Sequence, residues 1–296
     1  MIVLEKCPVC GDKNILFKFS AKDNTVTNDL FEIWECKNCT LRFTQNIPGK
    51  DEIGKYYQSE NYISHSDTSK GLINNLYHKV RKRTLLNKKN LVENTTGKKT
   101  GNILDVGSGT GAFLQTMKLA NWNTTGVEPD ETARKKALEL YGIEPENSET
   151  FFHLPSQSFD AITLWHVLEH VHELHKYMDQ LKSLLRPGGK LFIAVPNYTS
   201  YDAHYYKEYW AAYDVPRHLY HFSPTAMKKL FAQHMMKVIQ LKPMWYDSVY
   251  VSMLSEQYKT GKPNPAKALM IGALSNMKAL ASIEKCSSVI YVGEKE

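Results

Sequence analysis

The chain has 296 residues, of which 42% are hydrophobic, and its 37 Lys and Arg against 31 Asp and Glu leave a formal net charge of +6. This composition is typical of a globular protein and excludes disordered and fibrous chains. The longest stretch without a charged residue, 106–117, is much shorter than the roughly 18 apolar residues of a membrane helix, so we expect no membrane span. The N-terminus has no signal-peptide pattern, which favours a cytoplasmic protein.

Four of the five cysteines lie near the N-terminus as two C-x-x-C pairs, Cys7 with Cys10 and Cys36 with Cys39. Each pair can form one half of a tetrahedral four-thiolate site. We therefore predict a zinc ribbon over residues 1–45. Four thiolates leave no open coordination position, so the zinc ion should be structural, and a module this small needs such a stabilising ion.

Residues 46–99 are predicted to form a connector followed by a basic amphipathic helix. The connector is polar and aromatic, and its tyrosines Tyr56, Tyr57 and Tyr62 are candidates to close over a bound cofactor. From 72 to 92 the apolar residues recur at helical spacing, with lysines and arginines between them.

Strand-like and helix-like segments alternate from Asn102 onward. This pattern predicts an α/β fold with a doubly wound, mostly parallel sheet over residues 100–296. The expected strands are 102–106, 122–128, 158–165, 190–196, 237–241 and 287–293, and the expected helices are 110–121, 131–142, 167–185, 225–234, 248–258 and 266–283.

An aromatic stretch at about 197–222 interrupts the alternation, with many tyrosines and few aliphatic residues. We interpret it as a cap over the carboxyl edge of the sheet. Its rings could stack on a nucleic acid base or on a planar small acceptor, or they could form a packed lid whose tyrosines only pair their hydroxyl groups.

The strongest site signal is the sequence LDVGSGTG, in which a strand ends at Asp105 and glycines follow at Gly107, Gly109 and Gly111. The glycines allow a tight turn and close approach of a ligand to the backbone, and the next helix offers free N–H groups. A pyrophosphate would be repelled by Asp105, and the spacing is not that of a dinucleotide site. A zwitterion such as S-adenosylmethionine fits better, and Glu128 at the end of the next strand can accept hydrogen bonds from both ribose hydroxyls.

Four segments in order, LDVGSGTG, GVEPD, FDAITLWHVLEHV and LRPGGKLFIAVPN, resemble the class I S-adenosylmethionine-dependent methyltransferases over about residues 100–240. The chain is most similar to their small-molecule branch with the ubiquinone methyltransferases, as is its later segment VPRHLYHFSP. The resemblance implies a seven-stranded Rossmann-like sheet and methyl transfer to an oxygen or carbon of a small or medium-sized acceptor. It also implies the cofactor contacts, namely Asp105, Gly107, Ser108, Gly109 and Gly111 for the methionine part, Glu128 for the ribose, and Leu164 and Trp165 near the sulfonium.

One feature of that family has no clear counterpart. Its members often have an acidic residue after the third strand that meets the adenine amino group. The corresponding region here reads SETFFHLP, with Glu149 one position away from the expected place. The adenine contact therefore stays open.

Three histidines are candidates for the base that removes a proton from the acceptor, because methyl transfer from a sulfonium mainly needs alignment and deprotonation. His166 is the first choice by position, followed by His218 and then His170, although each could simply bond a neighbouring loop. We expect His166 and His170 one turn apart at the start of the helix after the fourth strand.

A second metal site in the same stretch is disfavoured. The sequence HELH is one residue short of the H-E-x-x-H pattern, and regularly spaced apolar residues around it indicate a helix that faces the core.

Two other functions stay open. The ribbon, the net charge and the basic stretch 79–99 would suit an RNA methyltransferase that uses the ribbon to bind RNA, although charges between apolar helical positions are commonly a solvated face. Alternatively, the protein is a noncatalytic scaffold that keeps the cofactor as a structural ligand.

Overall fold

The computed structural model describes residues 1–57 and 72–296, and for 72–78 it describes the backbone alone. The predicted connector residue Tyr62 lies outside these ranges. The strands are β1 (Ile15–Lys22), β2 (Leu30–Cys36), β3 (Arg42–Thr44), β4 (Asn102–Val106), β5 (Asn123–Val127), β6 (Phe159–Trp165), β7 (Leu185–Pro196), β8 (Tyr220–His221), β9 (Met236–Pro243) and β10 (Ser288–Lys295).

The α-helices are α2 (Leu72–Thr96), α3 (Ala112–Lys118), α4 (Glu131–Tyr141), α5 (Leu174–Leu184), α6 (Tyr201–Tyr206), α7 (Pro224–Gln233), α8 (Asp247–Thr260) and α9 (Pro265–Ala281). Short 3-10 helices are η1 (Ile53–Tyr57), η2 (Ser148–His153), η3 (Leu168–His170), η4 (Lys207–Tyr209), η5 (Ala211–Tyr213) and η6 (Ile283–Lys285).

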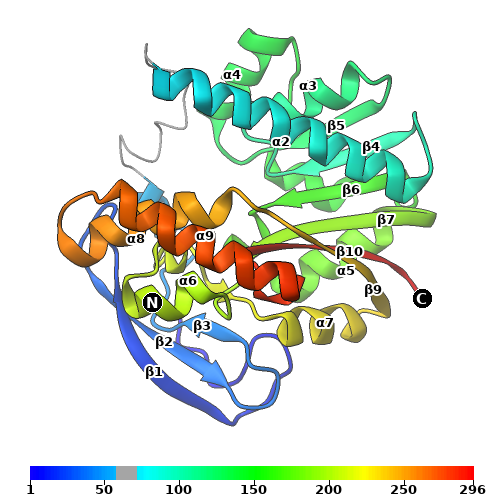
Figure 1. Ribbon diagram of the computed structural model, residues 1–296. Helices are drawn as coiled ribbons and strands as arrows, with labels where there is room; N and C mark the ends of the chain where they lie inside the picture. The colour runs from blue at the N-terminus through cyan, green and yellow to red at the C-terminus, as the bar shows by residue number, and fades with distance from the viewer. Residues whose placement is uncertain (58–71) are drawn as a thin grey trace.

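The central sheet has the order β5-β4-β6-β7-β10-β9, in which β5, β4, β6 and β7 are parallel and β10 runs antiparallel to both of its neighbours. In Figure 1, α2 crosses in front of this sheet and α5 lies behind it. Since the strands of a doubly wound sheet are covered on both faces, central strands such as β6 are apolar and buried over nearly their whole length. The predicted α/β, Rossmann-like fold class is confirmed.

The central sheet has six strands within the described residues, so the expected number of seven needs correction. Beyond β5 a single parallel bridge joins Val127 to Glu146. Directly after this bridge, Asn147 accepts a hydrogen bond from the backbone N–H of Glu149 and begins η2. The chain therefore turns into a helical segment after one residue pair, before a seventh strand can form.

The N-terminal ribbon and the aromatic cap share a second, antiparallel sheet with the order β1-β2-β3-β8. The cap strand β8 pairs with β3, where Phe43 lies opposite Tyr220. The ribbon residues Leu41 and Phe43 also belong to the same buried cluster as Leu164 of the central sheet. The ribbon, drawn in blue at the bottom of Figure 1, is thus packed into the main core through the cap.

A buried ion cluster strengthens this junction. Arg217 of the cap is 1% exposed, and its guanidinium binds Asp214, Asp23 of the ribbon and the carbonyl oxygen of Tyr56 at 2.6 to 3.0 Å. Buried charges are stable only when they are paired and hydrogen-bonded, and here each partner satisfies the others. The cluster joins ribbon, connector and cap at one point.

The helix expected from residue 167 begins later than predicted. A 3-10 turn, η3, covers Leu168–His170, and α5 begins at Leu174. The backbone carbonyl of Glu169, which would accept a bond from Glu173 in an α-helix, instead accepts one from Leu219 of the cap at 2.8 Å. The cap therefore prevents helix formation at this position.

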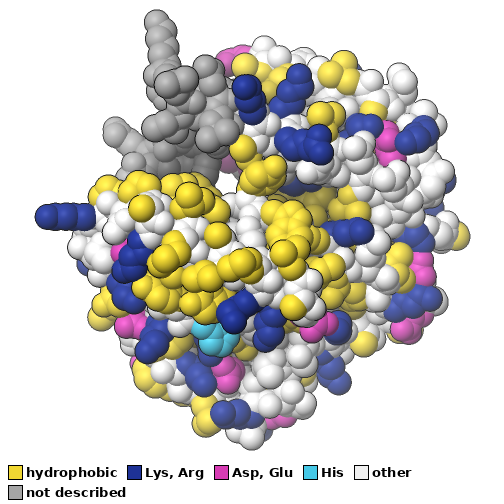
Figure 2. Space-filling view, viewed as in Figure 1, with side chains coloured by type: hydrophobic (Ala, Val, Ile, Leu, Met, Phe, Trp, Pro, Cys, Tyr) yellow, Lys and Arg dark blue, Asp and Glu magenta, His cyan; other side chains and the backbone are white. Residues whose placement is uncertain are grey.

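Helices α8 and α9 pack against each other on the front of the molecule. Figure 2 shows apolar side chains gathered over them, and Tyr250, Met253, Leu269, Met270 and Met277 are among the exposed large ones. In the part of the chain that the structure describes, no helix is both long and apolar enough to cross a membrane.

Candidate functional site

The glycine loop after β4 adopts the backbone that the sequence pattern predicts. Gly107, Gly109 and Gly111 have φ angles of 70°, 52° and 78°, in the left-handed region that favours glycine. At Gly107 a Cβ atom would lie 2.4 Å from Cγ2 of Val167, whereas at Gly109 it would meet nothing within 4 Å. The loop therefore touches the segment after β6 at Gly107 and leaves space for a ligand at Gly109.

Asp105 lies at the end of β4 with its carboxylate buried, and Thr163 donates a hydrogen bond of 2.6 Å to its Oδ1. Burial raises the pKa of Asp105 to about 7, although the Thr163 bond and the ammonium group of Lys88 oppose the shift. A buried acid in this state gains from a cationic partner, such as the ammonium group of a ligand.

Lys88 of α2 already brings a positive charge to this place. Its Nζ lies 4.3 Å from the centre of the Trp165 ring, and burial lowers the pKa of Lys88 to about 8 while Asp105 and Asp247 act against that shift. The site thus holds a cation against the face of an aromatic ring beside a carboxylate. A sulfonium and an ammonium group would find the same partners.

Glu128 directly follows β5, and its carboxylate accepts backbone hydrogen bonds from Gly109 at 2.7 Å and from Asp130 at 2.9 Å. Burial raises the pKa of Glu128, and these two bonds oppose the shift. A carboxylate can accept about four hydrogen bonds, so two remain for ligand hydroxyls. The neighbouring Ser108 hydroxyl is buried without a hydrogen-bond partner among the described residues, which fits a polar ligand at the loop.

The two residues expected near the sulfonium differ in what they present. Leu164 is fully buried in the core cluster that lies under β6, so its side chain faces away from the edge. Trp165 is partly exposed, packs edge-on against Phe113 and has an indole N–H without a partner among the described residues. Within this pair, Trp165 has the side chain that can meet a ligand.

His166 lies between two carboxylates. Its Nε2 is 3.0 Å from Oδ2 of Asp247, its Nδ1 is 3.4 Å from Oε1 of Glu169, and its φ of 60° is left-handed. Burial lowers the pKa of His166, but the bonds to Asp247 and then Glu169 outweigh burial and raise it to about 10. This geometry favours the doubly protonated, cationic form of the ring at neutral pH.

His170 and His218 come together although they lie far apart in the sequence. Their rings pack edge to face with centroids 4.6 Å apart. Nδ1 of His170 bonds the carbonyl of Arg217 at 3.1 Å, and Nδ1 of His218 bonds the carbonyl of Ala212 at 2.9 Å. Burial, followed by the effect of His218, lowers the pKa of His170 to about 4, so His170 is neutral.

The connector residue Tyr57 also reaches this place, since its hydroxyl lies 3.1 Å from Nδ1 of His170. Its neighbour Tyr56 is instead buried edge-on against Phe31 of the ribbon. The two described connector tyrosines thus have different surroundings, the His170 ring for Tyr57 and the ribbon core for Tyr56.

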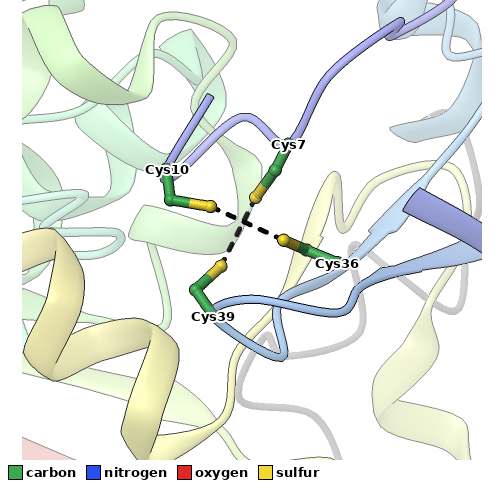
Figure 3. A group of neighbouring side chains, drawn as sticks. All are labelled: Cys7, Cys10, Cys36 and Cys39. Carbon is green, nitrogen blue, oxygen red and sulfur yellow. Dashed lines mark hydrogen bonds between the residues drawn. The ribbon is translucent and has the colours of Figure 1, made fainter. Parts of the chain in front are cut away.

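The four ribbon cysteines converge as the C-x-x-C spacing predicts (Figure 3). Their sulfur atoms all lie within 4.8 Å of one another, with Cys7 to Cys39 at 3.4 Å and Cys10 to Cys36 at 3.5 Å. In a tetrahedral zinc site with Zn–S bonds of about 2.3 Å, the sulfur atoms would be roughly 3.8 Å apart. The thiols therefore fit a zinc ion with little movement.

The aromatic cap is a packed layer over the ribbon, in agreement with the packed-lid alternative. Arg42 of β3 lies 4.1 Å from the centre of the Tyr198 ring and donates a hydrogen bond of 2.7 Å to the Tyr213 hydroxyl. Trp210 is 2% exposed and donates its N–H to Asp202. These groups find their partners inside the protein.

A cleft of about 600 Å³ opens between α2 and the segment that joins β9 to α8. It includes Lys88 and Asp247, and Asp247 is the residue bonded to His166. The other residues that line the cleft include amide, apolar and aromatic side chains, for example Asn87, Leu91 and Trp245. The cleft thus adjoins the edge that carries Asp105 and Trp165.

Comparisons with known proteins agree with this geometry. Residues 77–241 match a family described as a methyltransferase domain. A ubiquinone biosynthesis O-methyltransferase of Actinobacillus pleuropneumoniae is 35% identical over 109 residues, which are 33% of this chain and 46% of that protein. Its counterpart from Aeromonas salmonicida is 32% identical over 103 residues, 32% of this chain and 43% of that protein. The match thus spans less than half the length of these curated relatives.

Solved structures share the fold. A SAM-dependent methyltransferase from Archaeoglobus fulgidus superposes with a TM-score of 0.51 at 18% identity, over 73% of this chain and 94% of that one. Magnesium protoporphyrin IX methyltransferase from Synechocystis, solved with bound SAH, gives 0.53 at 14% identity, over 81% and 97%. At these identities the likeness is one of fold.

Proposed function

Because the chain belongs to the methyltransferase domain family that its residues 77–241 match, we propose that it transfers a methyl group from S-adenosylmethionine to an oxygen atom of a small-molecule acceptor. The main observation in support of this proposal is the edge formed by Asp105, the glycine loop and Glu128. This edge offers a carboxylate for an ammonium group, open space beside Gly109 and a second carboxylate for hydroxyl groups.

The residues of this edge suit the cofactor in charge and hydrogen-bonding capacity. Asp105 and Trp165 would hold the positively charged end, Gly107, Ser108, Gly109 and Gly111 the methionine part, and Glu128 the ribose. S-adenosylmethionine, when bound, supplies the methyl group and its sulfur leaving group. Lys88 has to leave the Trp165 face for a sulfonium to lie there, since two cations would repel each other.

Calorimetry of S-adenosylmethionine binding tests this assignment. We expect Glu128→Gln to weaken binding by about 10- to 100-fold, because a charge-assisted hydrogen bond contributes roughly 1.5 to 3 kcal/mol. Glu131→Gln, an exposed acid that pairs with Lys135, is the matched control and should bind like the wild type. Equal affinity of the Glu128 variant and the wild type would contradict the assignment.

On the acceptor side, we propose that His170 and His218 are the functional histidines. The acceptor oxygen must lose a proton as it attacks the methyl carbon and the C–S electron pair moves to sulfur. His166, with a carboxylate beside each ring nitrogen, would orient the loop through Glu169 and Asp247. A His166→Gln variant should therefore retain more turnover than His218→Gln.

A small acceptor is supported by the relatives, which are named for O-methylation in ubiquinone biosynthesis. The basic helix offers less to RNA than its sequence predicts, since Lys88 faces the cofactor edge and Lys89 pairs with Glu93. Mass spectrometry of a cell extract incubated with the enzyme and methyl-labelled cofactor identifies the acceptor directly. Labelled RNA as the product would contradict this proposal.

We also propose that the four cysteines bind one structural zinc ion. Their spacing and convergence support this, and a site of reduced thiolates suits the cytoplasm. The ion would hold the two C-x-x-C turns together at the base of β2 and β3. Its content can be measured after removal of loosely bound metal, and less than one equivalent would contradict the proposal.

A further inference from the structure

We propose that Glu169, His170 and His218 form a second metal site, which binds a divalent transition-metal ion beside the methyl-transfer edge. One ligand atom from each residue lies within 4.8 Å of the other two. Two imidazoles and one carboxylate are the protein ligands of several catalytic zinc and non-haem iron sites. The sequence did not indicate this site, because His218 comes from the cap and not from the H-E-x-x-H-like stretch.

The hydrogen bonds of the two histidines present the correct nitrogen atoms. In each ring Nδ1 donates to a backbone carbonyl, of Arg217 for His170 and of Ala212 for His218, which leaves the Nε2 lone pair available. Metal-binding histidines commonly donate their other N–H to such an acceptor, which fixes the tautomer and the ring orientation. Both rings are thus oriented as ligands before an ion arrives.

Glu169 supplies the independent observation. Its side chain is 0% exposed and, apart from the 3.4 Å ion pair of Oε1 with His166, neither of its oxygens accepts a hydrogen bond from the described residues. Apart from the neighbouring His166 ring, this buried carboxylate lacks the hydrogen bonds that usually offset desolvation. A cation between Glu169 and the two Nε2 atoms would supply a further partner.

The geometry requires a small adjustment. With metal–ligand distances of about 2.1 Å, ligand atoms are roughly 3 to 3.5 Å apart, so atoms that now lie within 4.8 Å of one another must approach by up to about 1.8 Å. Asp214 is also close, with Oδ2 at 3.9 Å from Nε2 of His218, but its carboxylate is held by Arg217 at 2.6 and 3.0 Å. Three ligands leave at least one coordination position open.

The position of the site connects it to methyl transfer, and this role, unlike binding itself, rests on the proposed function. Val167, two residues before Glu169, touches the glycine loop at Gly107. An acceptor hydroxyl at the open position would have its pKa lowered by the ion, release its proton to water and attack the methyl carbon, while the C–S electron pair goes to sulfur. Neither histidine would then serve as base.

The test uses the full chain with its ribbon loaded with zinc, titrated with Co²⁺ by calorimetry and followed by absorption. We expect one further equivalent of Co²⁺ without the intense thiolate charge-transfer band that cobalt in the four-cysteine site would show. Glu169→Gln and His218→Ala should weaken this binding by about 100-fold. His153→Ala, an exposed histidine outside the cluster, is the control and should bind like the wild type.

Absence of Co²⁺ binding beyond the ribbon, or unchanged binding in both variants, would overturn the inference. Thermal unfolding of each variant checks that it is folded, and the wild-type spectrum alone already tests for nitrogen and oxygen ligands. S-adenosylmethionine binding is measured in parallel. If the wild type binds S-adenosylmethionine but not Co²⁺, the metal site is contradicted while the proposed function stands. If the wild type does not bind S-adenosylmethionine, the proposed function itself is contradicted.

Discussion

The proposed cofactor edge and the proposed acceptor-side cluster are built in different ways. Asp105, the glycine loop and Glu128 lie at the ends of two neighbouring parallel strands, and each comes from a short continuous motif. Tyr57, His170 and His218 come from the connector, the turn after β6 and the cap, which are held together by the ribbon. One site therefore depends on local backbone conformation, and the other on the packing of distant segments.

The largest effect should follow from loss of the zinc ion. Cys36→Ser should lose zinc and lower the stability of the whole protein in a single thermal transition, because the ribbon shares its core with the central sheet. Structural zinc can contribute on the order of 10 kcal/mol to folding. Metal analysis and circular dichroism measure both effects.

The control for that variant is Cys286→Ser, which changes a buried cysteine outside the cluster and should keep a full equivalent of zinc. Two separate transitions in Cys36→Ser, with the second at the wild-type temperature, would show that the ribbon folds independently of the cofactor edge.

The next largest effect is expected at the ion cluster that joins ribbon and cap. Arg217→Met leaves Asp23 and Asp214 without their buried partner and should lower the free energy of unfolding by about 3 to 5 kcal/mol. Arg186→Met removes a partly exposed ion pair with Asp160 and should cost at most about 1 kcal/mol. Chemical denaturation measures the free energy of unfolding of both variants. Similar losses in the two would mean that Arg217 does not stabilise the junction between ribbon and cap.

A smaller effect should distinguish two glycines of the cofactor edge. Gly107→Ala combines a left-handed φ with a contact of 2.4 Å to Val167, so it should lose about 2 to 3 kcal/mol of stability and weaken cofactor binding. In Gly109→Ala the alanine would have the same strained left-handed φ, but its Cβ would meet no other atom, so the variant should lose only about 1 kcal/mol of stability. Adding Val167→Ala to the Gly107 variant should recover the steric part, and no recovery would argue against the contact.

The smallest effect is a pH dependence at the cofactor edge. Since burial raises the pKa of Asp105 to about 7, the carboxylate is increasingly protonated below that pH, and affinity for S-adenosylmethionine should fall by up to about tenfold per pH unit. The raised pKa of Asp105 also lowers the stability of the folded protein as pH rises from about 3.9, the pKa of an aspartate in the unfolded chain, towards 7. In this range the aspartate is already ionised in the unfolded chain but still protonated in the folded protein. Calorimetry across pH 5 to 8 should show the slope in the wild type and lose it in Asp105→Asn.

Two sequence predictions concern residues whose bonding partners lie far away in the chain, and one of the two was wrong. The helix after β6 was expected from residue 167, but the carbonyl of Glu169 bonds Leu219 of the cap. His166 was expected as a base, and this stays a prediction, yet its Nε2 bonds Asp247, which lies 81 residues away. No local pattern in the sequence contains these partners.

By itself, the sequence determined the fold class of this protein and the local patterns on which the proposed cofactor and zinc sites rest. The alternation of strands and helices, the glycine loop, the two acids at strand ends and the paired cysteines are local patterns, because backbone conformation and ligand spacing depend on neighbouring residues. Only the tertiary structure decided that the ribbon packs on the cap, that His166 is held between two acids, and that Glu169, His170 and His218 converge. These arrangements depend on contacts across long stretches of chain, which packing of the whole core selects.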